Sequence, residues 1–166
     1  QTGPYAPHAG HDINYIALAG ALAHFGRAGD KPTPPINMVG DFGGGGMMLA
    51  FGMVSALLNV ARGGEGQVID AAMTDGSAVL MGMIHGMRNA GVWQEDLGVN
   101  ALDTGAHFYD TYETADGKFV SIGSIEPQFY AQLRELAGLS GDLDFDAQHD
   151  RSQWPALKAK LTEVFR

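Results

Sequence analysis

The sequence predicts an α/β protein in two parts, an α/β part that ends near residue 91 and a small α+β part that begins after about residue 107. Two observations predict this division. Helical spacing of apolar residues dominates the first half, which contains a single strand pattern, whereas two β-rich runs around a tight-turn signal open the second half. One strand cannot form a sheet, so we expect other strands of that sheet to lie outside this chain.

Composition excludes several classes of protein. With 166 residues and 45% apolar residues, the chain can build the core of one ordinary domain, which excludes intrinsic disorder as its main state. A net charge of −9 leaves no basic surface of the kind that binds nucleic acid. The absence of cysteine excludes disulfides, thiolate nucleophiles and Cys-ligated metals.

Apolar stretches are expected to be too short to cross a membrane. Polar residues or glycine interrupt them before the roughly 18 residues that a spanning helix needs, and no signal peptide is recognisable. We therefore expect a soluble chain, in the bacterial cytoplasm or, in a eukaryote, in an organelle. Because the chain begins with Gln1 and stops at Arg166 within a predicted helix, we also expect it to be a piece of a longer polypeptide.

Four elements are predicted in the first part. Apolar spacing with Asp12 as N-cap predicts a helix over 13–26. A glycine loop, VGDFGGGG, then starts a buried helix over 46–62, whose sequence is apolar and Ala-rich. The Val/Ile run in GEGQVIDAAM (64–73) is typical of a short strand, and helical spacing returns over 74–90.

The second part carries a hairpin signal. Two runs rich in aromatic and β-branched residues, HFYDTYET and KFVSIGS, flank Asp116 and Gly117, and Asp-Gly between such runs predicts a β-hairpin. The preceding segment 91–107 has no period and is predicted to be a connector. Helical spacing over 128–138, and again from about 152, predicts two helices separated by an acidic linker.

His11 and Asp12 stand at a predicted helix start. A helix N-terminus offers unpaired N–H groups and a partial positive charge, which can hold an oxyanion. A loop histidine beside an ordinary N-cap aspartate would show the same pattern. The local sequence leaves both interpretations open.

Asp41 lies in VGDFGGGG, between apolar neighbours and four glycines. We expect its carboxylate to be partly buried, and buried carboxylates are candidate bases. The alternative is a turn aspartate that bonds its own backbone. The glycines are not a nucleotide-binding loop, because no Lys-Ser/Thr follows them and no strand precedes them, so they favour close approach of the backbone to a ligand or to another helix.

Glu126 stands where a predicted strand ends and a helix begins, a usual place for a site residue and also for a capping glutamate. Methionines gather in the central third, where they would line either an adaptable apolar surface or the core. They are Met47, Met48, Met53, Met73, Met81, Met83 and Met87. Five further histidines without metal-like spacing are predicted to be structural or solvent-facing: His8, His24, His85, His107 and His149.

Three stretches in this order, GHDINYIALAG (10–20), NMVGDFGGGGM (37–47) and GAHFYDTYETADGKFVSIGSIEPQFY (105–130), resemble the α-methylacyl-CoA racemases of the family III CoA-transferase superfamily. The resemblance extends from the first residue to about residue 140. Members of that family are considerably longer than this chain, which accounts for the strands expected outside it.

The resemblance also implies an architecture. Residues 1–91 would belong to a partial, Rossmann-like large domain that binds CoA, 92–107 would be a connector, and 108–166 would form an incomplete small α+β domain. Family members form interlocked dimers in which the active site is built from both chains. A homodimer is therefore expected, with an exposed apolar surface on any isolated monomer.

The activity that the resemblance implies is racemisation of 2-methylacyl-CoA thioesters by 1,1-proton transfer through an enolate, without metal or cofactor. Such a transfer needs one base on each face of the enolate, and the matching residues are His11 and Asp41. Glu126 would orient His11, and the backbone N–H of Asp12 would stabilise the thioester oxygen. The implied substrate-contacting residues are Gly10, Asp12, Ile13, Asn14, Tyr15 and Asn37.

Two alternatives stay open. In CoA-transferases of the same superfamily the aspartate at the position of Asp41 is a nucleophile that forms an acyl anhydride. Those enzymes usually lack a histidine at the position of His11, so His11 together with Glu126 favours the racemase. The second alternative is a catalytically incomplete piece that serves only in assembly, because 10 Lys and Arg leave few cations for the phosphates of CoA.

Overall fold

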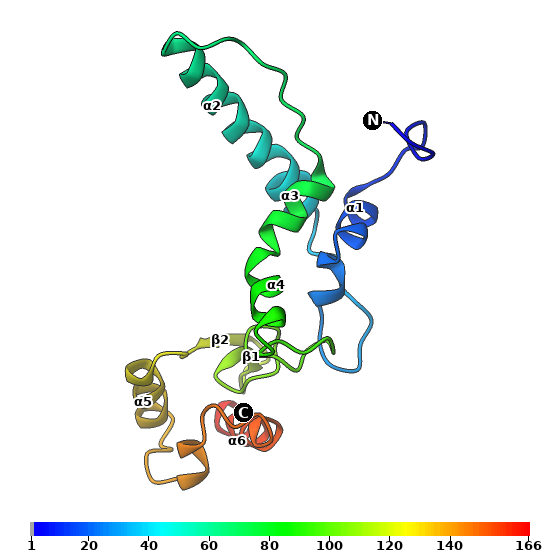
Figure 1. The fold of residues 1–166 in the computed structure, drawn as a ribbon. Helices are drawn as coiled ribbons and strands as arrows, with labels where there is room; N and C mark the ends of the chain where they lie inside the picture. The colour runs from blue at the N-terminus through cyan, green and yellow to red at the C-terminus, as the bar shows by residue number, and fades with distance from the viewer. Residues whose placement is uncertain (1) are drawn as a thin grey trace. The chain divides into compact units, whose positions relative to one another are not determined.

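A computed structural model describes residues 2–166, which divide into two compact units. Unit 1 comprises the residues up to Phe25 together with Pro32–Trp93, and unit 2 comprises Gly26–Lys31 and Gln94–Arg166. Figure 1 identifies the elements of each unit along the chain. Helices dominate and the sheet is small and antiparallel, which confirms a mixed fold. The predicted domain limits at residues 91 and 107 remain a prediction.

Unit 1 begins with a helix that is shorter than predicted. Helix α1 spans Asp12–Leu18 and a 3₁₀ turn, η1, spans Ala21–His24, in place of one helix over 13–26. The break lies at Gly20, whose φ of +82° is left-handed and cannot continue a right-handed helix. His11, with extended backbone, is the N-cap, so the prediction that Asp12 caps this helix is wrong.

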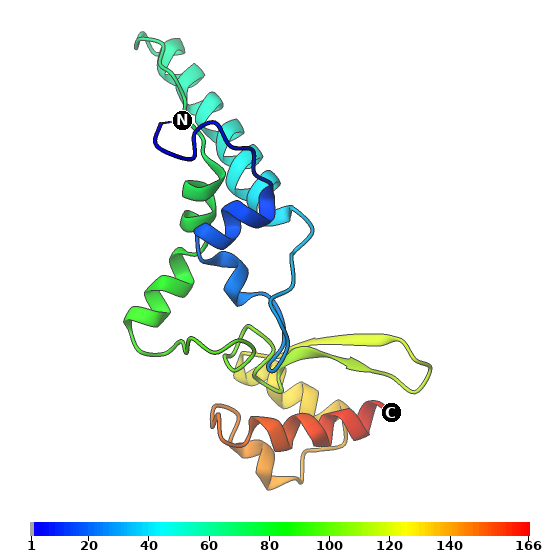
Figure 2. The ribbon, with the colours of Figure 1, turned by 90° about the vertical axis from the view of Figure 1, so that its right-hand side faces the viewer.

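The predicted glycine loop is helical. A π-helix, η2, spans Met38–Met47 and continues directly into α2, Met48–Ala61. Its glycines allow a close helix crossing, because a Cβ at Gly44 would lie 2.7 Å from the backbone nitrogen of Ser77. Figure 2 shows α1 beside this same stretch. The four glycines predicted to be a loop therefore form a helix. Its backbone packs closely against another helix, which is one of the two roles expected of these glycines.

Helix α2 is exposed, contrary to the prediction of a buried helix over 46–62. No residue of α2 is buried, and Figure 1 shows it leading away from α1 and α3 within unit 1. Together with η2 it makes a continuous helix of 24 residues, Met38–Ala61, that by length and composition could cross a membrane. Asp41 and several glycines interrupt its apolar residues, and this one helix does not indicate a membrane span. Length and composition alone remain a weak indication of a span, since the core helix of a soluble protein meets the same criteria.

The strand predicted within 64–73 is wrong for this chain. Residues 64–72 form no regular element, and Val68 is 96% exposed, because none of the described residues provides a neighbouring strand for this segment. Helical spacing over 74–90 is confirmed as α3, Met73–Leu80, followed by α4, Gly82–Asn89. The buried apolar centre of unit 1 consists of Ile16, Ala21 and Met81.

Unit 2 contains the predicted hairpin. Strands β1, Tyr109–Glu113, and β2, Phe119–Gly123, pair antiparallel with Tyr112 opposite Val120. The predicted helices follow as α5, Pro127–Leu136, and α6, Trp154–Phe165, and the acidic linker between them contains a 3₁₀ turn, η3, Leu143–Asp146. The connector 91–107 has no helix or strand, as predicted.

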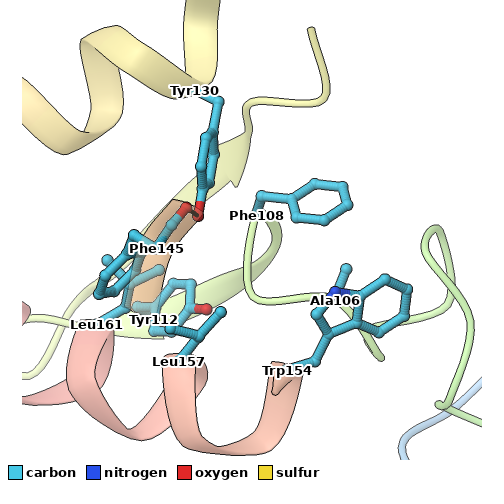
Figure 3. Close-up of a cluster of buried hydrophobic side chains, with 8 residues drawn as sticks. All are labelled: Ala106, Phe108, Tyr112, Tyr130, Phe145, Trp154, Leu157 and Leu161. Atoms are coloured by element: carbon cyan, nitrogen blue, oxygen red, sulfur yellow. Dashed lines mark hydrogen bonds between the residues drawn. The ribbon is translucent and has the colours of Figure 1, made fainter. Parts of the chain in front are cut away.

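A compact aromatic core holds unit 2 together. Figure 3 shows Tyr130 from α5 and Phe145 from η3 with Leu157 and Leu161 from α6. The hydroxyl of Tyr130 donates to the carbonyl of Phe145 at 3.0 Å, which joins α5 to η3 within the core. The remaining buried members of this cluster are Ala106, Phe108, Tyr112 and Trp154.

A buried aspartate ties the short segment Gly26–Lys31 to the rest of unit 2. Asp110 accepts two hydrogen bonds from Arg27, at 2.8 and 3.1 Å, and pairs with Lys158 at 2.6 Å. These hydrogen bonds lower the pKa of Asp110, although burial by itself would raise it. The contacts between Arg27 and Asp110 therefore attach Gly26–Lys31, which precedes Pro32 in the sequence, to the rest of unit 2.

Candidate active site

His11 is held at the start of α1 by its backbone. As N-cap, it donates its backbone N–H to the side-chain Oδ1 of Asn14 at 3.0 Å, which satisfies one donor at the helix start. The His11 residue is exposed. An exposed residue at this position can be reached from outside unit 1. In general the first residues of a helix carry N–H groups without an intrahelical partner.

Asp12 is buried, with 3% of its surface exposed, and its carboxylate reaches another element. Its Oδ2 accepts the backbone N–H of Asp41 at 2.7 Å. Residues 11–12 and 41 are therefore brought together although 29 positions separate Asp12 from Asp41. Local patterns do not reveal a contact of this range, and none of the roles predicted for Asp12 included a bond from its carboxylate to residue 41.

Asp41 lies on the first turn of η2 with its side chain exposed, so the expected partial burial is wrong in this chain. The alternative of a turn aspartate is also wrong, because the residue is helical. Its Oδ2 accepts a hydrogen bond from Nδ2 of Asn37 at 2.6 Å. Asn37 itself has a left-handed backbone, φ +56°, which starts the helix and orients this amide toward the carboxylate.

Four of the predicted substrate-contacting residues line one cavity beside His11. This cavity has a volume of about 740 Å³ and is walled by the first loop and one side of α1. Its lining includes Gly10, Ile13, Asn14 and Tyr15. Gly10 lies close to Tyr15 there, since a Cβ would lie 2.7 Å from the Tyr15 hydroxyl oxygen and would displace that side chain. The walls are mainly apolar, as in sites for small organic ligands.

Glu126 belongs to unit 2, where it is the N-cap residue of α5. Glu126 therefore occupies the predicted capping position, although its side chain makes no capping hydrogen bond, and the residue is exposed. The segment before it is fixed by buried Gln148, whose Nε2 donates to the carbonyls of Ser124, at 3.2 Å, and Ile125, at 2.9 Å. Sequence patterns did not predict this role of Gln148, because its amide acts across 23 residues.

The methionines divide between core and surface. Met81 is buried, whereas Met47, Met53 and Met83 are 68%, 48% and 58% exposed. Among residues 2–166, no group of three or more histidine, aspartate or glutamate side chains is placed to hold a metal ion.

Comparison with known proteins gives a family and two close relatives. The family model for CoA-transferase family III matches residues 1–166. The chain is 47% identical to a mouse alpha-methylacyl-CoA racemase and 46% identical to the human one, in both cases over 99% of this chain and 43% of the relative. It thus spans less than half the length of these curated relatives.

The fold is shared with solved structures. A CAIB/BAIF family protein from Brucella suis matches 99% of this chain and 44% of its own, with a TM-score of 0.72 and 25% sequence identity. This match confirms a family fold for the described chain.

Proposed function

Because this chain belongs to CoA-transferase family III, we propose that it carries the acid/base residues of an enzyme that racemises 2-methylacyl-CoA thioesters. The observation that carries the proposal is the hydrogen bond from the Asp41 backbone to the Asp12 carboxylate, which joins the segment of His11 to that of Asp41. The 46–47% identity to racemases over 99% of the chain supports the choice of reaction.

In the proposed reaction one base removes the proton on the carbon next to the thioester carbonyl. The electron pair of that C–H bond moves into the enolate and charges the thioester oxygen. The backbone N–H of Asp12, at the start of α1, stabilises this oxyanion. The second base then returns a proton to the opposite face, which inverts the carbon.

His11 and Asp41 are the two proposed bases. Both are exposed and both stand at the beginning of a helix in unit 1, on different elements, which allows them to serve opposite faces of a planar enolate. Asn37, which donates to the Asp41 carboxylate, orients that base. Glu126 is proposed to orient His11, from the same subunit or from the partner in a homodimer.

The substrate is proposed to be an acyl-CoA, and only proton transfers are required, so the reaction as written uses no cofactor. The cavity lined by Gly10, Ile13, Asn14 and Tyr15 is offered as part of its binding surface. Exposed Met47 and Met53 provide an apolar surface over which an acyl chain can move. We place the enzyme in the cytoplasm of a bacterium or, in a eukaryote, in an organelle.

A CoA-transferase is the second candidate, favoured by the family's own description. In that reaction the exposed carboxylate of Asp41 attacks the thioester carbonyl and forms an acyl anhydride while CoA leaves as a thiolate. His11 has no role as a base in that reaction. A racemase, by contrast, needs His11 as the second base.

The test is α-proton exchange on the full-length gene product in deuterium oxide, followed by NMR with each enantiomer of a 2-methylacyl-CoA. The proposal predicts deuterium uptake with inversion from either enantiomer. Transfer of CoA to an added carboxylate, without exchange, would instead establish Asp41 as a nucleophile. If neither reaction occurs, the chain has only a structural role.

A further inference from the structure

The carboxylate of Asp12 sits between two helix starts. It belongs to the first residue of α1, and it accepts the Asp41 N–H from the first turn of η2. The first turn of any helix leaves N–H groups without intrahelical partners. In η2, Phe42 comes one residue after Asp41 and donates a π-type bond to the carbonyl of Asn37 at 3.2 Å. The Asp41 N–H is therefore a donor that needs an acceptor from elsewhere, and Asp12 supplies it.

This contact is closely packed. Asp12 is 3% exposed, and Gly40, the residue before Asp41, is buried directly against it. A Cβ on Gly40 would overlap Oδ2 of Asp12 and would lie 2.8 Å from its Cγ and 3.0 Å from Cγ2 of Ile16. Only a residue without a side chain fits at position 40 while the carboxylate stays where it is.

We infer that the Asp12 side chain is a positioning residue that sets where Asp41 stands relative to His11. The inference rests on the proposed function, in which these two residues are the bases. The backbone of Asp12 follows His11 directly, and its side chain holds the main chain of Asp41, so a single residue fixes both base-bearing segments. A displacement of about 1 Å at a reacting group can lower a rate about 100-fold, which makes such a connection effective in catalysis.

Charge favours the same arrangement. A carboxylate near a helix N-terminus is stabilised by the partial positive charge there, and this buried carboxylate adjoins the first turns of two helices. Asn at position 12 would keep an acceptor oxygen of the same size and lose only the charge. Ala would remove the acceptor and leave the partly buried Asp41 N–H without this partner.

The experiment compares variants of the full-length gene product by α-proton exchange from each enantiomer. Asp41→Asn first identifies the enantiomer whose exchange depends on Asp41. Asp12→Ala is expected to lower kcat for that same enantiomer about 10- to 100-fold more than for the other, with KM changed less than about threefold. Asp12→Asn should recover most of this loss.

Gly40→Ala perturbs the contact from the side of η2 and should show the same preference between enantiomers. Gly86→Ala, a glycine-to-alanine change in α4, is the matched control, because its Cβ would meet nothing within 4 Å. Asp70→Ala, an exposed aspartate of unit 1 outside the site, controls for loss of a negative charge. Both controls should exchange like the unchanged protein.

Equal losses from both enantiomers in Asp12→Ala and Gly40→Ala, or no recovery in Asp12→Asn, would overturn the inference. A second readout separates this failure from failure of the proposed function. Hydrogen–deuterium exchange of the peptide covering 37–47 should speed up in Asp12→Ala and not in Gly86→Ala, whether or not the protein is a racemase. If the unchanged protein shows no α-proton exchange, the function fails; if the peptide exchange is unaltered, the positioning contact fails.

Discussion

The two units differ in how completely each buries its own apolar residues. Unit 2 surrounds eight buried core residues with hairpin, helices and 3₁₀ turn, whereas the apolar centre of unit 1 has three. Unit 1 instead exposes large apolar side chains along α2, with Phe51 at 74% and Leu57 at 67%. Burial of apolar surface is the main favourable term in folding, so unit 2 has the stronger basis for holding its structure within this chain.

This difference indicates that α2 in unit 1 depends on protein outside this chain to cover its apolar residues. A contiguous apolar face of the kind seen on α2 marks a contact with other protein, or an aggregation surface when uncovered. The relatives are more than twice as long as the matched segment, since it covers 43% of them. We expect the remaining length of such a protein, or a second subunit, to cover α2.

The largest expected effect contrasts one leucine from each unit. Leu161→Ala removes a fully buried side chain from unit 2 and should lower its free energy of unfolding by about 2–5 kcal/mol. Leu57→Ala, on α2, should change stability by less than about 0.5 kcal/mol in this chain. Urea unfolding followed by Trp154 fluorescence, in a Trp93→Phe background, measures the first effect. Equal effects of the two substitutions on the chain would contradict the comparison.

The next effect is a pH dependence of unit 2. His107 is fully buried, and burial, followed by nearby Lys158 and His149, lowers its pKa to about 4. Its Nε2 lies 2.7 Å from the Tyr130 hydroxyl, which gives its own proton to the Phe145 carbonyl, so Nε2–H is the donor and Nδ1 carries no proton. The neutral imidazole is therefore the form that the core accepts.

The sign of the pH effect follows from this lowered pKa. In the unfolded chain the His107 imidazole, with a pKa near 6.5, binds a proton at a pH where the folded protein keeps it neutral. The free energy of unfolding therefore falls as pH falls from about 6.5 to about 4. The slope should approach about 1.4 kcal/mol per pH unit in this window. His107→Gln should flatten it, whereas His85→Gln, at an exposed position, should leave it unchanged. A His107→Gln protein with the original slope would show that another group causes it.

A smaller effect is expected at the helix crossing of unit 1. A Cβ on Gly76 would overlap the carbonyl oxygen of Gly44, so Gly76→Ala must push α3 and η2 apart. Overpacking of this kind costs about 1–3 kcal/mol. Scanning calorimetry should show a lower unfolding temperature for unit 1. An unchanged transition would mean that the crossing is not tightly packed.

The smallest expected effect has the opposite sign. Gly86 lies within α4, its backbone is not in the left-handed region, and a Cβ there would meet nothing within 4 Å. Gly86→Ala should therefore stabilise unit 1 by about 0.5–1 kcal/mol, because alanine loses less backbone freedom on folding. The same calorimetry checks it. A loss of stability would indicate an undetected contact on α4.

Prediction from the sequence succeeded where the signal is local. Asp116-Gly117 between β-rich runs predicted the hairpin, and apolar spacing predicted α5 and α6. Both signals are local, because turn type and helical periodicity depend on residues close together in the sequence. It failed at Val68 and on α2, because strand formation and burial depend on partners, and the described chain provides none there. Side-chain contacts across long distances, such as Asp12 with Asp41, could not be predicted either.

For the site, residue types and motif resemblance identified His11, Asp41 and Glu126 as candidates, and their catalytic roles stay predictions. The expected burial of Asp41 was wrong because a carboxylate flanked by apolar letters need not face inward on a helix: Gly40 and Gly44 turn toward the neighbours instead. The sequence did not show which side of η2 faces its neighbours, because the π-helical geometry of η2 decides which residues are buried.

His11 and Asp41 on unit 1 are proposed to serve opposite faces of one substrate carbon. The most direct test measures α-proton exchange from each enantiomer with His11→Ala and Asp41→Asn variants of the full-length gene product. We expect opposite preferences: His11→Ala loses exchange mainly from one enantiomer and Asp41→Asn mainly from the other. Loss of exchange from the same enantiomer in both variants would contradict it.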